Sequence, residues 1–240
     1  MERTSSLAAL EVDPDEPAPD LEGCDPAYIV AWVAERHRVA FPTGFGAEGC
    51  ALIDMIARRG LRVEIMTLDT GLLFPETRAL WRRLELRYGL PIRAVLPERT
   101  VEEQAVREGP SLWARDPDRC CELRKVEPLR RALLGFGAWI SGVRRDQTPD
   151  REGIAIVEAD TRFGLIKVSP LAAWTSERVW DYVRAHDVPT NELHGRGYPS
   201  VGCWPCTTAA LAGEDPRAGR WRGRAKTECG LHQISTPGRK

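Results

Sequence analysis

The chain has 240 residues, of which 42% are hydrophobic and 29% charged. This length suits one full α/β domain and is short for two, so a single domain is expected. No apolar run approaches the roughly 18 residues that a membrane span needs, and the N-terminus lacks the basic start and apolar stretch of a secretory signal. These features argue against a membrane partner and predict a cytoplasmic protein.

The net charge of −1 hides an uneven distribution. Residues 1–25 carry eight acidic residues against the single Arg3, and residues 1–24 are expected to be disordered because they are acidic and contain prolines. Basic residues crowd the stretch 217–226, which suggests an anionic ligand. The acidic start and the small total charge argue against a nucleic-acid partner.

Strands and helices alternate along the middle of the chain. Apolar spacing and turn residues predict helix 27–38, strand 39–41, helix 48–59, strand 62–68, helix 75–88, strand 92–95, helix 100–108, helix 119–134 and strand 138–141. This alternation predicts an α/β fold with a parallel, doubly wound sheet and right-handed crossovers. The pattern is less regular afterwards: 154–158 and 165–168 are interpreted as a hairpin or two edge strands, and 176–186 as a capped helix.

Three of the predicted strands end in loops suited to an anionic ligand, which binds beyond the carboxyl ends of the strands in an open parallel sheet. The first loop leads into a helix whose free N–H groups could hold a phosphate, and the third carries two arginines whose planar guanidinium groups match phosphate oxygens. The candidate contacts are Thr43, Gly44, Gly46, Leu68, Asp69, Thr70, Gly71, Arg144 and Arg145. A single glycine-bearing turn is more often structural than functional, so the grouping of these loops favours a site.

Five of the seven cysteines fall in a pattern that chemistry would use. The adjacent pair Cys120 and Cys121 and the pair Cys203 and Cys206 can close a four-sulfur site for iron–sulfur or zinc. Neighbouring helical residues point about 100° apart, so the adjacent pair requires a local distortion or the start of a helix. Cys229 is then free to act as a nucleophile.

Four blocks of this sequence, in this order and spacing, resemble the assimilatory adenylyl-sulfate reductases, the iron–sulfur type of the phosphoadenylyl-sulfate reductase family. The blocks are Leu68-Asp69-Thr70-Gly71 through Phe74-Pro75-Glu76-Thr77, Cys120-Cys121-Glu122-Leu123-Arg124-Lys125, Gly197 through Thr207 with its Cys203-Trp204-Pro205-Cys206, and Glu228-Cys229-Gly230-Leu231-His232. The resemblance covers residues 41–232. The loop at 41–46 departs from the family's serine-rich run, so Thr43 is expected to replace a serine hydroxyl.

The resemblance implies thioredoxin-dependent reduction of adenosine 5′-phosphosulfate to sulfite and AMP, in the assimilation of sulfate. It implies an adenine-nucleotide α-hydrolase-like fold over residues 25–232, with a flexible catalytic tail from about 207 to 232 and a disordered end at 233–240. One four-iron four-sulfur cluster per chain would be held by Cys120, Cys121, Cys203 and Cys206. Cys229 would be the nucleophile that becomes S-sulfocysteine. A homo-oligomer is left open.

The resemblance also assigns Lys125 a place between cluster and substrate, Arg217 and Arg220 contacts to the sulfate, and His232 a role after the nucleophile. Elementary chemistry agrees, because a thiolate is the natural attacker on soft sulfur but meets a substrate that carries negative charge. Two unit charges about 4 Å apart repel by roughly 4 kcal/mol at an effective dielectric near 20. Nearby cations must therefore compensate. The alternative, non-functional interpretation of Lys125, Arg217 and Arg220 is that they lie on a solvated helix face or loop.

Three alternatives remain. A 3′-phosphoadenylyl-sulfate reductase, or an enzyme that uses both nucleotides, shares the tail cysteine but lacks the two cysteine pairs. An ATP-dependent synthetase or tRNA-thiolating enzyme would carry a Ser-Gly-Gly-x-Asp-Ser loop, which is absent. A zinc-binding structural or nucleic-acid module would use the two pairs alone, although adjacent cysteines are unusual for tetrahedral zinc. Cys24 and Cys50 have no matching role, and Cys50 is interpreted as a small buried hydrophobe.

Overall fold

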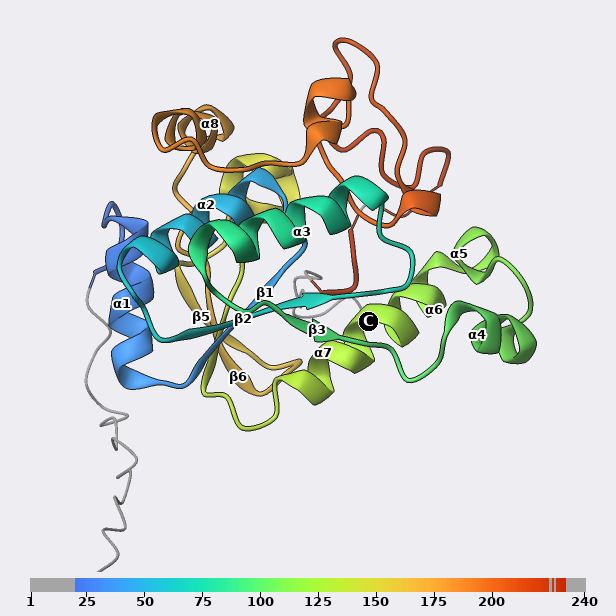
Figure 1. Ribbon diagram of the computed structural model, residues 1–240, viewed down its shortest axis with the longest axis horizontal. Coiled ribbons are helices and arrows are strands. Elements are labelled where there is room, and N and C mark those ends of the chain that lie inside the picture. Colours follow the sequence, from blue (N-terminus) through green and yellow to red (C-terminus); the bar gives the residue numbers. More distant parts are fainter. Residues whose placement is uncertain (1–19, 225, 227, 232–240) are drawn as a thin grey trace, which may run out of the picture.

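The computed structural model describes residues 20–224, 226 and 228–231, and its core is a six-stranded sheet in the order β3-β2-β1-β4-β6-β5 (Figure 1). The strands are β1 (Val39–Thr43), β2 (Val63–Leu68), β3 (Arg93–Val95), β4 (Ala138–Ile140), β5 (Val157–Asp160) and β6 (Leu165–Val168). All neighbours are parallel except β5, which runs antiparallel to β6 at one edge. The predicted α/β class and parallel sheet are confirmed. Of the two arrangements expected for the late strands, a hairpin or two edge strands, the structure has the hairpin of β5 and β6.

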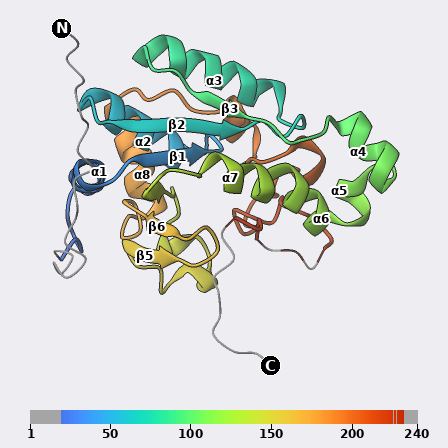
Figure 2. The same cartoon turned by 90° about the horizontal axis from the view of Figure 1, so that it is seen from below.

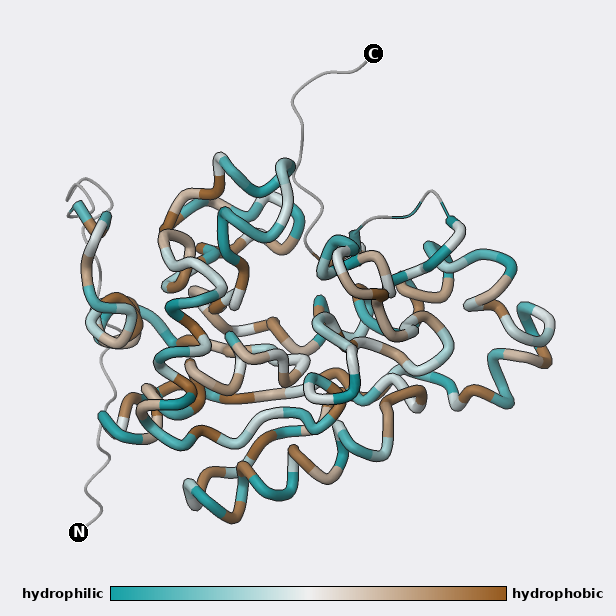
Figure 3. Tube along the Cα trace, turned by 90° about the horizontal axis from the view of Figure 1, so that it is seen from above, coloured by the Kyte–Doolittle hydropathy of each residue, from teal (hydrophilic) through white to brown (hydrophobic). Residues whose placement is uncertain are grey.

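Helices cover both faces of this sheet. Alternating residues of a strand point to opposite faces, and Val39 and Phe41 accordingly join a different apolar cluster from Ala40. The first cluster takes side chains from α1 (Pro26–Arg36), α2 (Ala47–Arg58), α3 (Pro75–Tyr88) and α8 (Ser176–Ala185). The second takes them from α7 (Glu127–Ala132), which lies on the opposite side of the sheet from α2 (Figures 1 and 2). Colouring by hydropathy shows polar and apolar residues alternating along the outer helices (Figure 3).

The helix boundaries follow from local chemistry. Asp25 caps α1 by accepting hydrogen bonds from the N–H groups of Ala27 and Tyr28. The helix α3 starts with a proline at its first position and ends at Gly89, whose φ of 62° is the left-handed conformation that glycine adopts without strain. A capping box between Thr100 and Glu103 starts α4 (Val101–Glu108).

The helix predicted for 119–134 is present, but it is not a regular α-helix. After the short α5 (Leu112–Arg115), the chain runs without a gap through α6 (Pro117–Cys121), a π-helical turn (Glu122–Val126) and α7. Pro128 explains the π-helical turn, because it lacks the N–H that a regular α-helix would bond to the carbonyl of Arg124. The local distortion expected beside the adjacent cysteines is therefore present.

The first described residues correct one boundary. Residues 21–24 were expected to belong to a disordered segment, yet Leu21 is only 5% exposed and Cys24 packs against the main core. Burial of an apolar side chain outweighs the acidic composition of its neighbours here. Residues 1–19 of that predicted segment, the end at 233–240 and His232 lie outside the described residues. No described helix has the length and apolar character to cross a membrane.

Candidate active site

A cavity of about 620 Å³ opens at the carboxyl ends of β1, β2 and β4. The chain turns from β1 towards β2 and β3 on one side, whereas β4 lies on the other side, so the cavity sits at the point where the strand order reverses. This is where open α/β sheets bind their ligands. Thr43, Thr70 and Ser141, each at or just after a strand end, line it.

The loop after β1 presents backbone donors to this cavity. The helix α2 begins after Gly46 with no side chain capping its first N–H groups, which leaves them available to an anion. Thr43 Oγ1 accepts a hydrogen bond of 3.1 Å from the N–H of Phe45. A Cβ added at Gly49 would lie 2.4 Å from that oxygen, so only glycine allows this approach. The predicted contacts Thr43, Gly44 and Gly46 all line the cavity.

The loop after β2 divides into lining and support. Leu68 and Thr70 line the cavity, whereas Asp69 and Gly71 do not. Asp69 instead receives two hydrogen bonds of 2.8 Å from the Arg78 guanidinium of α3 and one from the N–H of Gly71. Asp69 therefore fixes the turn and the start of α3.

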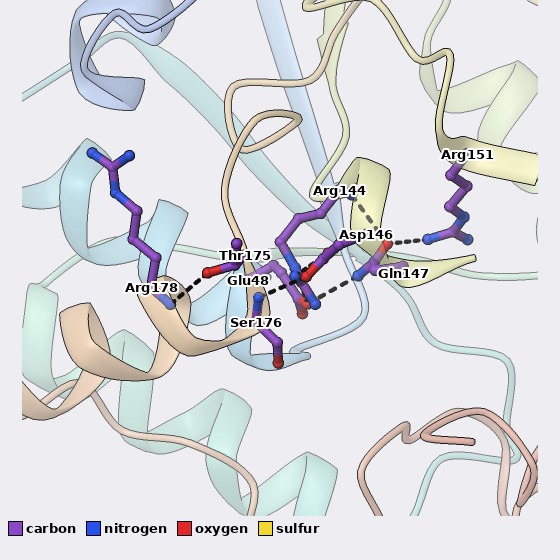
Figure 4. A network of polar contacts seen from close by, with 8 residues as sticks. All are labelled: Glu48, Arg144, Asp146, Gln147, Arg151, Thr175, Ser176 and Arg178. Carbon is purple, nitrogen blue, oxygen red and sulfur yellow. Dashed lines mark hydrogen bonds and ion pairs between the residues drawn. The ribbon is translucent and has the colours of Figure 1, made fainter. Parts of the chain in front are cut away.

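The two predicted arginines after β4 have separate positions. Arg144 lines the cavity and is 5% exposed; its Nε donates to Glu48 Oε1 at 3.0 Å, and it pairs with Asp146 (Figure 4). Arg145 is not part of the lining: it donates to the carbonyl of Ile154 and pairs with Glu22. The structure thus brings one of the two arginines to the cavity.

The two cysteine pairs, although far apart in sequence, line one small cavity beside the main one. Cys120 and Cys121 come from α6, and Cys203 and Cys206 from the loop around the short 3₁₀ turn Trp204–Cys206. That loop is tied to the strand-end loop after β2, because Thr70 Oγ1 lies 3.3 Å from Cys203 Sγ and the N–H of Trp204 donates to the carbonyl of Leu72 at 2.9 Å.

These four thiols fit the donor set of a four-iron cluster. Among the described residues, no group of three or more His, Cys, Asp or Glu side chains converges so that it could hold a metal ion. Each thiolate of a four-iron cluster binds a different iron, so its ligands need not meet at one point. Burial raises the pKa of Cys120 to about 11 and also raises that of Cys206. Such thiols become thiolates when a metal binds them.

Cys229 lies where the two cavities meet. It is 9% exposed, lines the larger cavity and packs against Cys121 and Trp221. A hydrogen bond from Cys121 lowers the pKa of Cys229, as do the positive charge of Lys125 and a hydrogen bond from the N–H of Leu231, against the effect of burial. Lys125 and the N–H of Leu231 favour the thiolate, which is the nucleophilic form, and they would still do so with Cys121 bound to a metal as a thiolate that donates no hydrogen bond.

Lys125 and Arg220 are shared by both cavities, as is Cys203. Burial opposes the charged form of Lys125, but its electrostatic interactions with Cys203, Cys229 and Cys121 outweigh burial and raise the pKa of the lysine. Arg220 lies against Gly202, where an added Cβ would be 2.3 Å from the guanidinium, and 4.5 Å over the ring of Trp221. Both cations are therefore held close to the Cys229 sulfur.

Arg217 also lines the main cavity, where its guanidinium donates to Glu228 at 3.2 Å, and burial lowers its pKa. The structure thus brings together Lys125, Arg217 and Arg220 of the predicted set. The predicted contact at His232 falls outside the described part of the chain.

Sequence reasoning missed three buried or half-buried charges here. Arg124 donates to the carbonyl of Thr70 and to Gln104. These bonds support the cysteine wall, by which we mean the chain segments that carry Cys120, Cys121, Cys203 and Cys206. Arg151 lines the main cavity and pairs with Glu228, the residue before Cys229. The position of Glu228 next to the proposed nucleophile was the available signal. The interpretation of Cys50 is confirmed: it is fully buried, and burial raises its pKa to about 12.

Comparisons with known proteins agree with this geometry. Residues 38–209 match the family model described as phosphoadenosine phosphosulfate reductase domain. The adenosine 5′-phosphosulfate reductase of Geobacillus thermodenitrificans is 49% identical over 85% of this chain and 88% of its own. The protein of the same name from Halalkalibacterium halodurans is 43% identical over 94% and 99%. The crystal structure of phosphoadenylyl-sulfate reductase from Candida auris, a phosphate complex, superposes with a TM-score of 0.71 at 32% identity, over 79% of this chain and 93% of that one.

Proposed function

The chain belongs to the phosphoadenosine phosphosulfate reductase family, and from this membership we propose that it reduces adenosine 5′-phosphosulfate to sulfite and AMP. The relatives at 43% and 49% identity carry the name adenosine 5′-phosphosulfate reductase, which favours this nucleotide. The observation that carries the proposal is the position of Cys229, buried between the nucleotide-sized cavity and the cysteine wall beside Lys125.

In the binding step, the nucleotide would lie across the carboxyl ends of β1, β2 and β4. The uncapped N–H groups at the start of α2 suit its phosphate. Arg217 and Arg220 suit the sulfate, since a guanidinium offers paired donors to tetrahedral oxyanions. The predicted contacts of Thr43, Gly44, Gly46, Leu68 and Thr70 belong to this step, as does that of Arg144.

In the transfer step, the Cys229 thiolate would attack the sulfate sulfur. The bond from Cys229 Sγ to sulfur forms while the bond from sulfur to the bridging phosphate oxygen breaks, so AMP leaves with that electron pair and the product is S-sulfocysteine. The approach of a thiolate to an anion is opposed by about 4 kcal/mol for one pair of charges about 4 Å apart at an effective dielectric near 20. Lys125 and Arg220, buried at this point, would supply the compensation.

Cys120, Cys121, Cys203 and Cys206 would hold a four-iron four-sulfur cluster. When bound, that group would supply a fixed electrostatic environment and order the wall that carries Lys125. The chain's own residues support this arrangement, because Arg124 and Thr70 anchor the two cysteine loops to each other.

In the release step, a thioredoxin thiolate would attack Cys229 Sγ and displace sulfite. A mixed disulfide would form between the proteins, and the second thioredoxin thiol would resolve it, so that both electrons come from thioredoxin. At 9% exposure Cys229 is out of reach of a second protein, so the tail must move between the two steps. A free thiol nucleophile suits a reducing compartment, and we place the reaction in the cytoplasm.

The decisive experiment is to trap the intermediate. The full-length protein, purified anaerobically, is mixed with ³⁵S-labelled adenosine 5′-phosphosulfate without thioredoxin, digested and analysed by mass spectrometry. We expect one sulfonate adduct on the peptide that contains Cys229, lost when reduced thioredoxin is added. A label elsewhere, or none, contradicts the proposal. The 3′-phosphorylated nucleotide in a parallel reaction tests the alternative substrate, which the likeness to the Candida auris enzyme keeps open.

A further inference from the structure

The tail that carries Cys229 is held to the body of the protein by an ion pair of its neighbour. Glu228 Oε2 accepts a hydrogen bond of 2.8 Å from Arg151, and the two side chains are 14% and 5% exposed. The same oxygen accepts from Arg217 at 3.2 Å. A carboxylate shared by two arginines and largely screened from water is a strong tether.

A second hydrogen bond, to Gln147, orients the Arg151 side chain. Its other terminal nitrogen donates to Gln147 Oε1, which also accepts from the N–H of Arg144, while Gln147 Nε2 donates to Glu48 at 2.9 Å (Figure 4). Glu48 lies in the first turn of α2, beside the proposed phosphate loop. A continuous set of hydrogen bonds therefore runs from the start of α2 to the tail.

The tail is tied on its other side as well. Lys226 pairs with Asp118 of α6, and Arg224 donates to the carbonyl of Ala114 of α5 at 2.6 Å. The segment before Cys229 therefore contacts α5 and α6 through Arg224 and Lys226, and it contacts the loop after β4 through Glu228. Through Arg151, the Glu228 end of this segment also contacts the polar network that reaches the start of α2.

We propose that the Arg151–Glu228 ion pair is the latch that keeps Cys229 enclosed over the cavity. Arg151 and Glu228 are positioning residues: they act on the reaction through the placement of the tail and leave the sulfur chemistry to Cys229. Closure itself does not depend on the proposed function. The consequence for the two half-reactions, given below, does rest on it.

The sharing of Glu228 separates the tasks of the two arginines. A sulfate that binds Arg217 competes with Glu228 for the Arg217 guanidinium. Arg151 is oriented by its hydrogen bond to Gln147 and remains paired with the Glu228 carboxylate. The latch therefore holds with substrate bound. It must open before thioredoxin can reach the sulfur, so weakening it slows transfer to Cys229 and does not slow release of sulfite.

The test measures how fast iodoacetamide labels Cys229 in the full-length protein, resolved by peptide mass spectrometry under anaerobic conditions without nucleotide. Arg151→Ala and Glu228→Gln are each expected to raise this rate at least about tenfold, because loss of one partner leaves the other charge buried and unpaired when the tail is closed. Arg184→Ala is the matched control, since its pair with Asp181 is about two-thirds exposed on both sides and lies on α8. Cys50, fully buried, reports unfolding in the same digest.

A charge exchange makes the test specific. Glu228→Arg alone should be labelled fast, and adding Arg151→Glu should bring the rate back towards that of the unaltered protein. Both proteins carry the same side chain beside Cys229, so a change in intrinsic thiol reactivity cancels in this comparison. If the double variant labels as fast as the single one, or if Arg151→Ala labels like the unaltered protein, the latch is overturned.

Single-turnover measurements then connect the latch to the reaction. In Arg151→Ala, formation of the Cys229 adduct from adenosine 5′-phosphosulfate should slow about tenfold or more, while thioredoxin-driven release of sulfite from a preformed adduct should be at least as fast as in the unaltered protein. Equal slowing of both steps contradicts the latch. If the unaltered protein forms no adduct, the proposed function is contradicted, but the iodoacetamide labelling rates still test whether the ion pair encloses Cys229.

Discussion

The cavity has two walls that are built in different ways. The nucleotide wall consists of loops at the carboxyl ends of β1, β2 and β4, which are in register through backbone hydrogen bonds. The sulfur wall is the cysteine wall together with the chain around it: helical segments between 112 and 132, and mostly irregular chain at 199–224, 226 and 228–231. Regular strands fix the first wall. Side-chain contacts and isolated backbone hydrogen bonds, such as that from the N–H of Trp204 to Leu72, fix the second, which under the proposed function carries a bound group and a moving tail.

This difference indicates where each kind of residue belongs. Phosphate recognition needs backbone donors at constant positions, and a sheet edge with a helix start supplies them. Sulfur transfer needs a nucleophile that is enclosed in one step and accessible in the next. The variants below separate the walls, because each substitution should damage the function of its own wall and leave the other intact.

The largest effect is expected for Cys229→Ser. A serine hydroxyl is a far weaker nucleophile than a thiolate, so sulfite production should fall by more than about 10⁴-fold. AMP binding by calorimetry and iron content should stay near those of the unaltered protein, because the cavity keeps its lining. Cys24→Ser is the control and should be fully active. Sulfite release at a normal rate from Cys229→Ser would remove the central assignment.

Cys121→Ser should break the sulfur wall alone. If Cys121 is a cluster ligand, its loss removes one of the four thiolates, and iron content measured by absorption near 400 nm should fall to a small fraction. Cys50→Ser tests a cysteine that is also buried but belongs to the main apolar core, and this variant should keep its iron. Equal iron content in both variants would contradict the ligand assignment.

Lys125→Ala should reduce kcat/KM by about 10²- to 10³-fold, because one buried cation offsets much of the repulsion estimated from Coulomb's law. Lys125→Arg should recover part of the loss, since it restores the charge with a different shape. Lys167→Ala is the control, as Lys167 pairs with Glu158 and does not line the cavity. A kcat/KM unchanged in Lys125→Ala would show that the lysine only fills space.

The nucleotide wall and its sheet were the parts most open to prediction from sequence. The boundaries of α3 were predicted to the residue, because Pro75 and Gly89 fix both ends. Thr43, Gly44, Gly46 and Thr70 follow from the rule for strand ends and do line the cavity. The rule could not distinguish residues that line the cavity from residues that support its loops. Asp69 was therefore predicted as a ligand contact, although it accepts hydrogen bonds from Arg78 and does not line the cavity.

The sulfur wall was open to prediction only through its cysteine pattern and the family resemblance. The helix predicted over 119–134 is present, but its irregular geometry was not predicted, because periodicity does not register a π-helical turn before a proline. Arg151 and Glu228 were missed because their ion pair joins residues 77 positions apart. No local pattern encodes such a pair, and only the folded chain brings the two charges together.

Gly49→Ala should damage the nucleotide wall alone. The added Cβ would lie 2.4 Å from Thr43 Oγ1, which is held by its hydrogen bond to Phe45, so the loop must shift. We expect KM for the nucleotide to rise about tenfold and stability to fall by about 1–3 kcal/mol, with iron content unchanged. Gly195→Ala, where an added Cβ meets nothing within 4 Å, is the control. An unchanged KM would place the phosphate elsewhere.

The smallest effect concerns a support of the nucleotide wall that touches neither ligand. Asp54 of α2 is fully buried and accepts hydrogen bonds from Tyr182 at 2.7 Å, Tyr88 at 2.8 Å and Arg58 at 2.7 Å. Tyr182→Phe removes one donor to a carboxylate that keeps the other two, which should lower the free energy of unfolding by about 1–3 kcal/mol.

For a chain of this size, that loss corresponds to a decrease in Tm of about 2–4 °C per kcal/mol, measured by calorimetry. Tyr88→Phe should behave alike, and Arg184→Ala, whose ion pair is exposed, should change stability by less than about 0.5 kcal/mol. Iron content and the labelling rate of Cys229 should not change in Tyr182→Phe, because its hydrogen bond joins α8 to α2 and does not involve the cysteine wall. A loss of iron or faster labelling in this variant would mean that the two walls are coupled through the packing of α8 on α2.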